Sequence, residues 1–125
     1  CGENTNPLAR YTMIAEGEQV HISTYPPIWP SHEPGKGNYD LAHAIRLRAG
    51  AHSFEAKAFN IVSSGFMDNA MFDFLAELDS NAGRILEASP RSVSLITNPG
   101  GGSISEERCD EEGIVYAELD LSECV

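Results

Sequence analysis

Positive charge is scarce in this sequence. Its 125 residues include 8 Lys and Arg against 19 Asp and Glu, which gives a formal net charge of −11. A chain this acidic repels the phosphate backbone of nucleic acids, so its composition argues against nucleic-acid binding. We interpret the acidic excess as a solvated surface.

Long hydrophobic runs are also missing. No apolar stretch approaches the about 20 residues that a membrane-spanning helix needs, so we expect no membrane partner. Hydrophobic residues still make up 42% of the chain, as in an ordinary globular domain. A length of 125 residues suits one domain, or about half of an α/β unit of ~250 residues.

Cysteine is sparse, with only Cys1, Cys109 and Cys124 in the chain. An odd number without CxxC spacing argues against both a disulfide framework and a zinc site. His32 and His43 have no partner at metal-ligand spacing, so we expect no metal and no other cofactor. The expected compartment is the reducing cytoplasm.

Hydrophobic periodicity predicts helices that alternate with strands. Asn6 is placed to cap a first helix that begins at Pro7 and stops near Gly17. The apolar face of this helix is expected to consist of Leu8, Tyr11, Ile14 and Ala15. The further predicted elements are a strand at 20–25, a helix at 39–59, a strand at 60–66, a helix capped by Asp68 or Asn69, a strand at 92–97, its hairpin partner at 103–108 and a last strand at 114–121. This order is typical of a mixed α/β fold.

Two parts of this pattern allow sharper expectations. The predicted helix at 39–59 carries a buried stripe made of Leu41, Ile45, Ala49, His52, Ala56 and Phe59. The glycines of the 98–102 segment lack the Lys and Ser/Thr of a phosphate-binding loop, so we interpret that segment as a hairpin turn.

The start of the chain carries the strongest chemical signal. Cys1 stands before Gly2 and a proline-led helix, and the N-terminus of a helix favours the thiolate, which is the nucleophilic form. An inert buried thiol is the alternative for Cys1, and an acid that merely suits the helix dipole is the alternative for Glu3.

The position of Cys1 also bears on domain organisation. No initiator Met precedes this cysteine, and no strand is available to lead into its turn. We therefore expect the chain to be a piece of a longer protein, cut just before its nucleophile.

At this point the sequence resembles a known family. The segments Cys1-Gly2-Glu3-Asn4 with Pro7-Leu8-Ala9-Arg10, Gly17 to Pro26, Arg48-Ala49, Phe54-Glu55 with Lys57-Ala58-Phe59, Ser94 to Pro99 with Gly101, and Glu112 to Leu121 are similar to nitrilases of the carbon–nitrogen hydrolase superfamily. These segments cover nearly the whole chain, and their order and spacing make the resemblance specific.

The resemblance implies a fold and a mechanism. The fold would be part of a four-layer α-β-β-α sandwich, with residues 1–125 as a partial carbon–nitrogen hydrolase domain truncated on its N-terminal side and at its C-terminal end. The mechanism would use a cysteine, a glutamate and a lysine, and only Cys1 can be carried over, because the other two precede the cysteine in the family. Gly2, Glu3 and Asn4 would lie around the nucleophile. In the implied reaction the N–H group of Gly2 would be a donor to the charged intermediate, and glycine would leave room for a substrate.

Residues after the first predicted strand are candidates for the substrate pocket. Tyr25, Pro26 and Trp29 offer the aromatic and aliphatic surface that usually lines such pockets. A packed loop or a subunit contact is the alternative for these three residues. His21 would pair with Cys1 in a cysteine-protease arrangement, but its place within a strand favours a structural or interface role.

Two further interpretations concern the long helix. His52 on its buried stripe is read as a satisfied core histidine. Arg48 and Glu55 are seven residues apart, two turns along one helix face, which favours a structural ion-pair network.

The expected substrate is a small nitrile or amide. A nitrilase reaction is the first hypothesis, and an amidase, a carbamoyl hydrolase or a cyanide-processing relative is the second. A third hypothesis, from another class, is a non-catalytic piece that lacks its Glu and Lys partners. The family also implies association into homo-oligomers.

Overall fold

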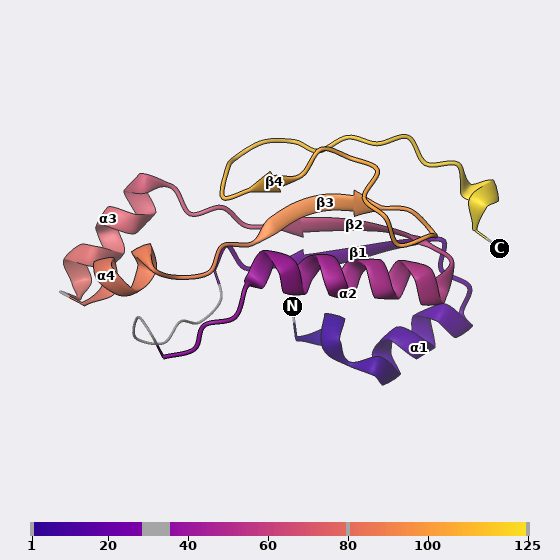
Figure 1. Cartoon of the computed structure of the whole chain (residues 1–125), viewed down its shortest axis with the longest axis horizontal. Coiled ribbons are helices and arrows are strands. Elements are labelled where there is room, and N and C mark those ends of the chain that lie inside the picture. Colours follow the sequence, from indigo (N-terminus) through magenta and orange to yellow (C-terminus); the bar gives the residue numbers. More distant parts are fainter. Residues whose placement is uncertain (1, 29–35, 80, 125) are drawn as a thin grey trace.

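The computed structural model describes residues 2–28, 36–79 and 81–124. In these residues four strands form one mixed sheet in the order β1-β2-β3-β4 (Figure 1). The strands are β1 (Val20–Tyr25), β2 (Phe59–Ser64), β3 (Val93–Thr97) and β4 (Arg108–Cys109). β1 and β2 are parallel, whereas β3 is antiparallel to β2 and β4 is antiparallel to β3. The predicted α/β class is confirmed.

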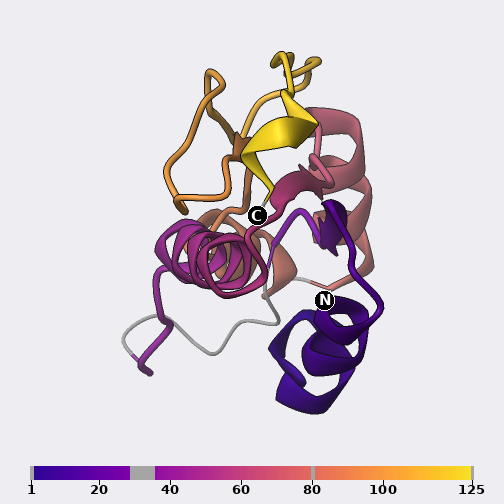
Figure 2. The same ribbon diagram turned by 90° about the vertical axis from the view of Figure 1, so that its right-hand side faces the viewer.

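Helix α2 (Leu41–Ala56) connects the two parallel strands and covers one face of the sheet (Figures 1 and 2). Asp40 caps it by accepting a hydrogen bond from the backbone N–H of His43. Leu41 and Ile45 are fully buried and pack with Val62 and Leu95 of the sheet. Every second residue of β1 points toward this helix, which is the alternation expected of a strand with one covered face.

The C-terminal end of α2 lies earlier than the sequence pattern predicted. Lys57 adopts a left-handed conformation, with φ 54°, and ends the helix after Ala56. Phe59, expected as the last residue of the helical stripe, instead begins β2 and donates its backbone N–H to the carbonyl of Gln19. Four further residues of the predicted stripe, Leu41, Ile45, Ala49 and His52, are buried as expected, whereas Ala56 is half-buried.

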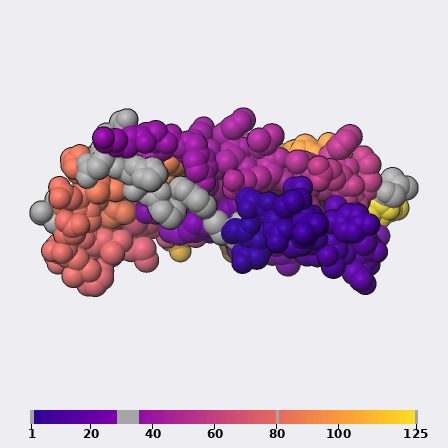
Figure 3. Space-filling view, turned by 90° about the horizontal axis from the view of Figure 1, so that it is seen from below, coloured from indigo at the N-terminus to yellow at the C-terminus, as the bar shows by residue number. Residues whose placement is uncertain are grey.

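The first helix, α1 (Pro7–Ala15), begins and ends close to the predicted positions. Its expected apolar face was wrong, because Leu8 and Tyr11 are 76% and 69% exposed. α1 instead turns Arg10 toward α2, where this side chain meets Glu55. Figure 3 shows α1 and α2 side by side along the same surface of the molecule.

The predicted turn after β3 is confirmed, and its tightness depends on glycine. Gly101 has φ +84°, and a Cβ atom there would lie 2.7 Å from the carbonyl oxygen of Gly50 in α2. The side chain of Asn98 holds the turn by accepting hydrogen bonds from the N–H groups of Gly100 and Gly102. These contacts let the turn lie directly against the helix.

The strands predicted after this turn were largely wrong. Among the described residues after the turn, backbone pairing with β3 is limited to a bridge between Thr97 and Ser103, a hydrogen bond from the N–H of Ile104 to the carbonyl of Ile96, and the short β4. No continuous strand therefore runs from 103 to 108. The segment 114–121 forms no strand with any described residue, and Tyr116 is 77% exposed. Period-two alternation cannot make a strand without a neighbouring strand to pair with.

A pair of helices projects from one end of the sheet (Figure 1). α3 (Asn69–Leu78) is capped by Asp68, which is one of the two predicted caps. α4 (Ala82–Glu87) was not predicted, because six residues are too few to establish a helical period. The two helices line a shared hollow with Leu75, Leu78 and Ile85.

The sheet face opposite α2 is only partly covered. Ile22 is 66% exposed there, and in the register of the sheet it lies beside Ile61, which pairs with Ile96. Residues 113–115 lie over part of this face, beside a groove of about 230 Å³. The described residues therefore supply two layers, a sheet and its helices. None of their helices is long and apolar enough to cross a membrane.

Candidate functional site

The candidate site starts at a tight turn. Gly2 has helical backbone angles, φ −61° and ψ −39°, and leads into a single 3₁₀ turn at Glu3–Thr5. Both the N–H and the hydroxyl of Thr5 donate to the carbonyl of Gly2, at 3.0 and 2.7 Å. The turn therefore fixes the backbone directly after the predicted nucleophile, Cys1, which itself lies outside the described residues.

Asn6 joins this turn to α1. Its side-chain oxygen accepts hydrogen bonds from the backbone N–H groups of Leu8 and Ala9, at 3.0 and 3.4 Å. Pro7 at the first helical position has no N–H group to satisfy. The predicted cap is confirmed, and α1 begins five residues after the turn starts.

Asn4 ties the turn to the sheet. Its side-chain amide donates to the backbone carbonyl of Thr24 at 3.1 Å. Since Thr24 and Tyr25 form the C-terminal end of β1, this bond brings the residues of the nucleophile motif to the end of a parallel strand. Ligands commonly bind beyond such strand ends in open α/β sheets.

Glu3 and Gly2 face outward from this turn. Glu3 is exposed, and a hydrogen bond with its own backbone lowers the pKa of its carboxyl group below the ordinary value. A Cβ atom on Gly2 would meet no atom within 4 Å. The backbone at Gly2 therefore does not itself require glycine, and the room for a substrate beside Cys1 stays a prediction, since Cys1 lies outside the described residues.

The residues expected to line the pocket have different surroundings. Tyr25 is 5% exposed and lies in the core beneath α2. Burial raises the pKa of its phenol, while the nearby charges of Arg48 and Arg10 act in the opposite direction. Its hydroxyl has no hydrogen-bond partner among the described residues. Pro26 is half-buried, and Trp29 lies outside the described residues, so this pocket stays a prediction.

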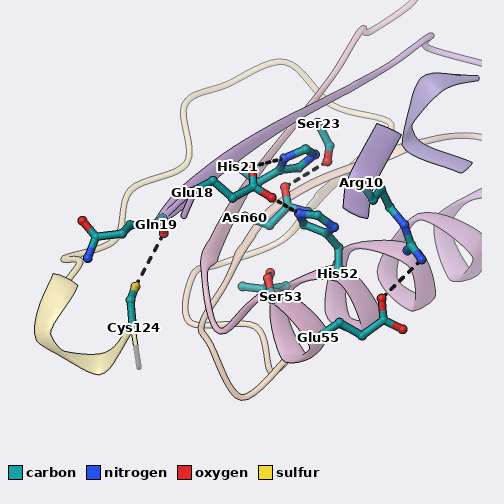
Figure 4. A network of polar contacts seen from close by, with 11 residues as sticks. Arg10, Glu18, Gln19, His21, Ser23, His52, Ser53, Glu55, Asn60 and Cys124 are labelled. Atoms are coloured by element: carbon teal, nitrogen blue, oxygen red, sulfur yellow. Dashed lines mark hydrogen bonds and ion pairs between the residues drawn. The ribbon is translucent and has the colours of Figure 1, made fainter. Parts of the chain in front are cut away.

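The structure assembles a cluster that sequence reasoning missed (Figure 4). Glu18 comes from the segment between α1 and β1, His21 from β1 and His52 from α2. One carboxylate oxygen of Glu18 lies 2.9 Å from Nδ1 of His21, and the other lies 2.5 Å from Nε2 of His52. The two imidazole rings stand 4.1 Å apart between centroids.

The cluster is largely closed to solvent. The side chains of His21 and His52 are 7% and 2% exposed, and that of Glu18 is 14% exposed. Burial lowers the pKa of His52, and the hydrogen bond to Glu18 partly opposes this effect. The core position expected for His52 is confirmed, but this histidine is not fully satisfied, because its Nδ1 atom has no hydrogen-bond partner among the described residues. His21 is buried within β1, as a structural role requires. Glu18 was missed, and its only signal was the Glu18-x-x-His21 spacing across the start of a strand.

The ion pair expected within α2 was wrong. Glu55 pairs with Arg10 of α1, with 3.3 Å between Nη2 and Oε2, and not with Arg48. Arg48 forms no ion pair with any described residue, and its Nη1 atom is buried without a hydrogen-bond partner. Two turns along a helix place side chains on one face, but a neighbouring helix offered Glu55 a nearer partner.

Comparison with curated proteins finds similar chains among enzymes named nitrilases. The chain is 27% identical to an arylacetonitrilase of Aspergillus kawachii over an alignment of 124 positions. It is 31% identical to an arylacetonitrilase of Fusarium vanettenii over an alignment of 134 positions. It is 28% identical to an aliphatic nitrilase of Rhodococcus rhodochrous over an alignment of 131 positions. These matches cover 98%, 100% and 100% of this chain but 37%, 38% and 32% of the relatives. No family model matches.

Solved structures show the same fold. A carbon–nitrogen hydrolase from Helicobacter pylori G27 matches 99% of the chain with a TM-score of 0.68 at 18% identity. Saccharomyces cerevisiae Nit3, a member of branch 10 of the nitrilase superfamily, matches 96% with a TM-score of 0.59 at 17% identity. The chain spans 39% and 35% of these two proteins. The family resemblance drawn from the motifs is confirmed.

Proposed function

We propose that this chain, which is related to the nitrilases of the carbon–nitrogen hydrolase superfamily, carries the nucleophile of a nitrile-hydrolysing enzyme. The substrate is a small nitrile, and the products are a carboxylic acid and ammonia. The observation that supports this most is the motif from Cys1 to Asn4, which leads straight into a turn bonded to the end of β1. The relatives named as nitrilases span the whole of this chain.

The proposed reaction has two halves. The thiolate of Cys1 adds to the nitrile carbon, and the nitrogen takes up a proton to give a thioimidate. One water molecule then adds to that carbon, the carbon–nitrogen bond breaks, and ammonia leaves behind a thioester. A second water molecule breaks the carbon–sulfur bond, which releases the acid and restores the thiol. No metal or organic cofactor is required.

The residues after Cys1 take supporting roles in this proposal. The N–H group of Gly2 has no acceptor among the described residues and is offered as a donor to the charged intermediate. Asn4 holds the turn against β1, so it positions the nucleophile rather than reacting. Glu3 is exposed on the turn that follows Cys1, and its lowered pKa keeps its carboxyl group ionised. The Glu base and the Lys that the family uses would come from a segment preceding Cys1 in a longer polypeptide.

The wider setting follows from the same resemblance. We propose a homo-oligomer in the cytoplasm, with the large exposed hydrophobic residues Leu8 and Tyr11 of α1 available for a subunit contact. Size-exclusion chromatography with light scattering tests the oligomer. Amides and carbamoyl compounds are the competing substrates within the superfamily, and competition between nitrile and amide substrates separates these activities.

The decisive experiment compares two cysteine substitutions in the full-length protein. C1A should abolish release of ammonia and acid from aliphatic and arylacetic nitriles. C109A is the matched control, because Cys109 is an exposed free thiol on β4. Mass spectrometry of the quenched wild-type reaction should find a substrate-derived acyl group on Cys1. Equal turnover by C1A and the wild type would overturn the proposal.

A further inference from the structure

We propose that Glu18, His21 and His52 form a binding site for one divalent transition-metal ion, for which Zn²⁺ is the best-suited candidate. The three side chains come from the segment between α1 and β1, from β1 and from α2. Their ligand atoms all lie within 4.8 Å of one another (Figure 4). The ion would join these elements and has no part in the proposed hydrolysis.

The donor set suits such an ion. Two imidazole nitrogens and one carboxylate form a three-ligand set that zinc and related metals accept, with a fourth position left for water. Neutral imidazole is the form that binds metals, and burial favours this form for His52. Mg²⁺ and Ca²⁺ prefer oxygen ligands, so the two imidazoles select against them.

The distances between the ligand atoms are close to those that a metal ion needs, although two of them are shorter. Ligand atoms on a tetrahedral ion with bonds of about 2.1 Å stand about 3.4 Å apart. The contacts of Glu18 with His21 and His52, at 2.9 and 2.5 Å, are shorter than this, and no pair of ligand atoms exceeds 4.8 Å. An ion would therefore take the place of the two hydrogen bonds after a small withdrawal of the carboxylate.

The surroundings permit that adjustment. Glu18 also lines a cavity of about 280 Å³ together with Gly17, Gln19 and Lys57, and its side chain keeps 14% of its surface exposed. On the far side of the His52 ring, Nδ1 has no hydrogen-bond partner among the described residues. The ring can pivot without losing a bond there.

Charges of both signs lie near the cluster, and Lys57, which lines the cavity beside Glu18, holds its ammonium over the ring of Phe54. Arg10 approaches His52, but its guanidinium is shared with Glu55 at 3.3 Å. The largely buried carboxylate of Glu18 faces two imidazoles, so a cation is the partner that balances its charge.

Cys124 is a further possible ligand near the site. It borders the cavity that Glu18 lines, and its thiol lies 3.6 Å from the carbonyl of Gln19. A contribution of its thiolate to metal binding therefore needs its own control.

The experiment uses the full-length protein after treatment with EDTA. Zn²⁺ is titrated by calorimetry and Co²⁺ by visible absorption, with Mg²⁺ as the negative control. We expect one Zn²⁺ per chain, no sulfur-to-cobalt absorption band and a thermal midpoint that rises with Zn²⁺. H52Q, H21Q and E18Q should each weaken Zn²⁺ binding by more than about tenfold. E18Q keeps the size of the side chain, so it covers the case in which a histidine variant fails to fold.

Two variants serve as controls. H43Q replaces an exposed histidine in the first turn of α2 and should bind Zn²⁺ as the wild type does. C124S should do the same. Binding that is unchanged in both H52Q and E18Q, binding lost in C124S, or no binding at millimolar Zn²⁺ would each overturn the proposal.

Discussion

Arg10 of α1 and Glu55 of α2 meet across the two helices, with Nη2 and Oε2 3.3 Å apart. This pair connects the helix that follows the candidate nucleophile to the helix that covers the sheet. Its two members differ in setting, because Glu55 is 52% exposed, whereas Nε of Arg10 is buried without a partner among the described residues. The pair therefore sets the orientation of α1 more than it adds stability.

The first prediction concerns the strength of this pair. A double-mutant cycle with R10M and E55Q should give a coupling energy below about 1 kcal/mol, because water screens a half-exposed carboxylate. Chemical denaturation of the four proteins measures it, and 1 M salt should reduce the coupling further. R10M alone should cost more than E55Q, because it also removes a long packed side chain. Coupling of several kcal/mol would contradict this view.

The second prediction separates stability from position. Asn6 caps α1 and Asp68 caps α3, each through its side-chain oxygen. N6A and D68A should each lower the free energy of unfolding by about 1 kcal/mol. Only N6A should also lower kcat for nitrile hydrolysis, because only its helix follows the nucleophile. Denaturation curves and steady-state kinetics measure both effects. An equal loss of kcat in D68A would remove the special role given to α1.

Gly2 provides the third prediction. Its backbone is helical and its missing Cβ would point into open space, so G2A should change the free energy of unfolding by no more than about 0.5 kcal/mol. If that space is where the substrate approaches Cys1, the added methyl group should lower kcat/KM for nitriles at least about tenfold. Circular dichroism melting and kinetics of the full-length variant measure the two quantities. Full activity in G2A would show that the space serves no substrate.

How far the sequence alone leads can be seen at single residues. Asn6, Pro7 and Asp68 act locally, so their caps were predictable from their immediate neighbours. The turn at 98–102 was predictable for the same reason. The Glu18 cluster was not, because it depends on how β1 packs against α2, and Glu18 and His52 are 34 residues apart in the sequence. The partner of Glu55 was missed because α1 lies against α2 by tertiary contact alone.

The strand expected at 114–121 failed for a related reason. Its residues have β-propensity, but a strand needs a neighbour that pairs with its N–H and C=O groups. Ile114 and Tyr116 are exposed, and only the start of the segment, at Ile114 and Val115, borders the groove over β2 and β3. Propensity identifies residues that suit a sheet, but it does not show where the neighbouring strand lies.

The fourth prediction uses the buried phenol of Tyr25. Burial raises its pKa in the folded protein above the ordinary value of 10.0. The folded state therefore keeps its proton where the unfolded state loses it, so the contribution of Tyr25 to stability is present below pH 10 and declines as the pH rises through the folded pKa. Y25F should remove this loss. Y116F is the matched control, because Tyr116 is exposed.

Urea denaturation at several pH values between 8 and about 11 measures this effect. The stability difference between Y25F and the wild type should shift in favour of Y25F as the pH rises above 10, because only the wild type has an ionisable group there. Y116F should run parallel to the wild type. A Y25F curve parallel to the wild type would mean that Tyr25 ionises as freely in the folded state as in the unfolded state.

The fifth prediction concerns residues 1–125 expressed alone. Ile22 on the open face of the sheet and Phe74 on α3 are 66% and 60% exposed. Because this apolar surface stays in contact with water, its burial does not stabilise the isolated chain. The family mechanism also requires a Glu and a Lys that precede the cysteine. We therefore expect the isolated chain to hydrolyse no nitrile and to melt without a sharp transition, whereas co-expression with the preceding segment should restore both properties. A cooperative melt together with nitrile turnover by residues 1–125 would show that the nucleophile segment needs no partner.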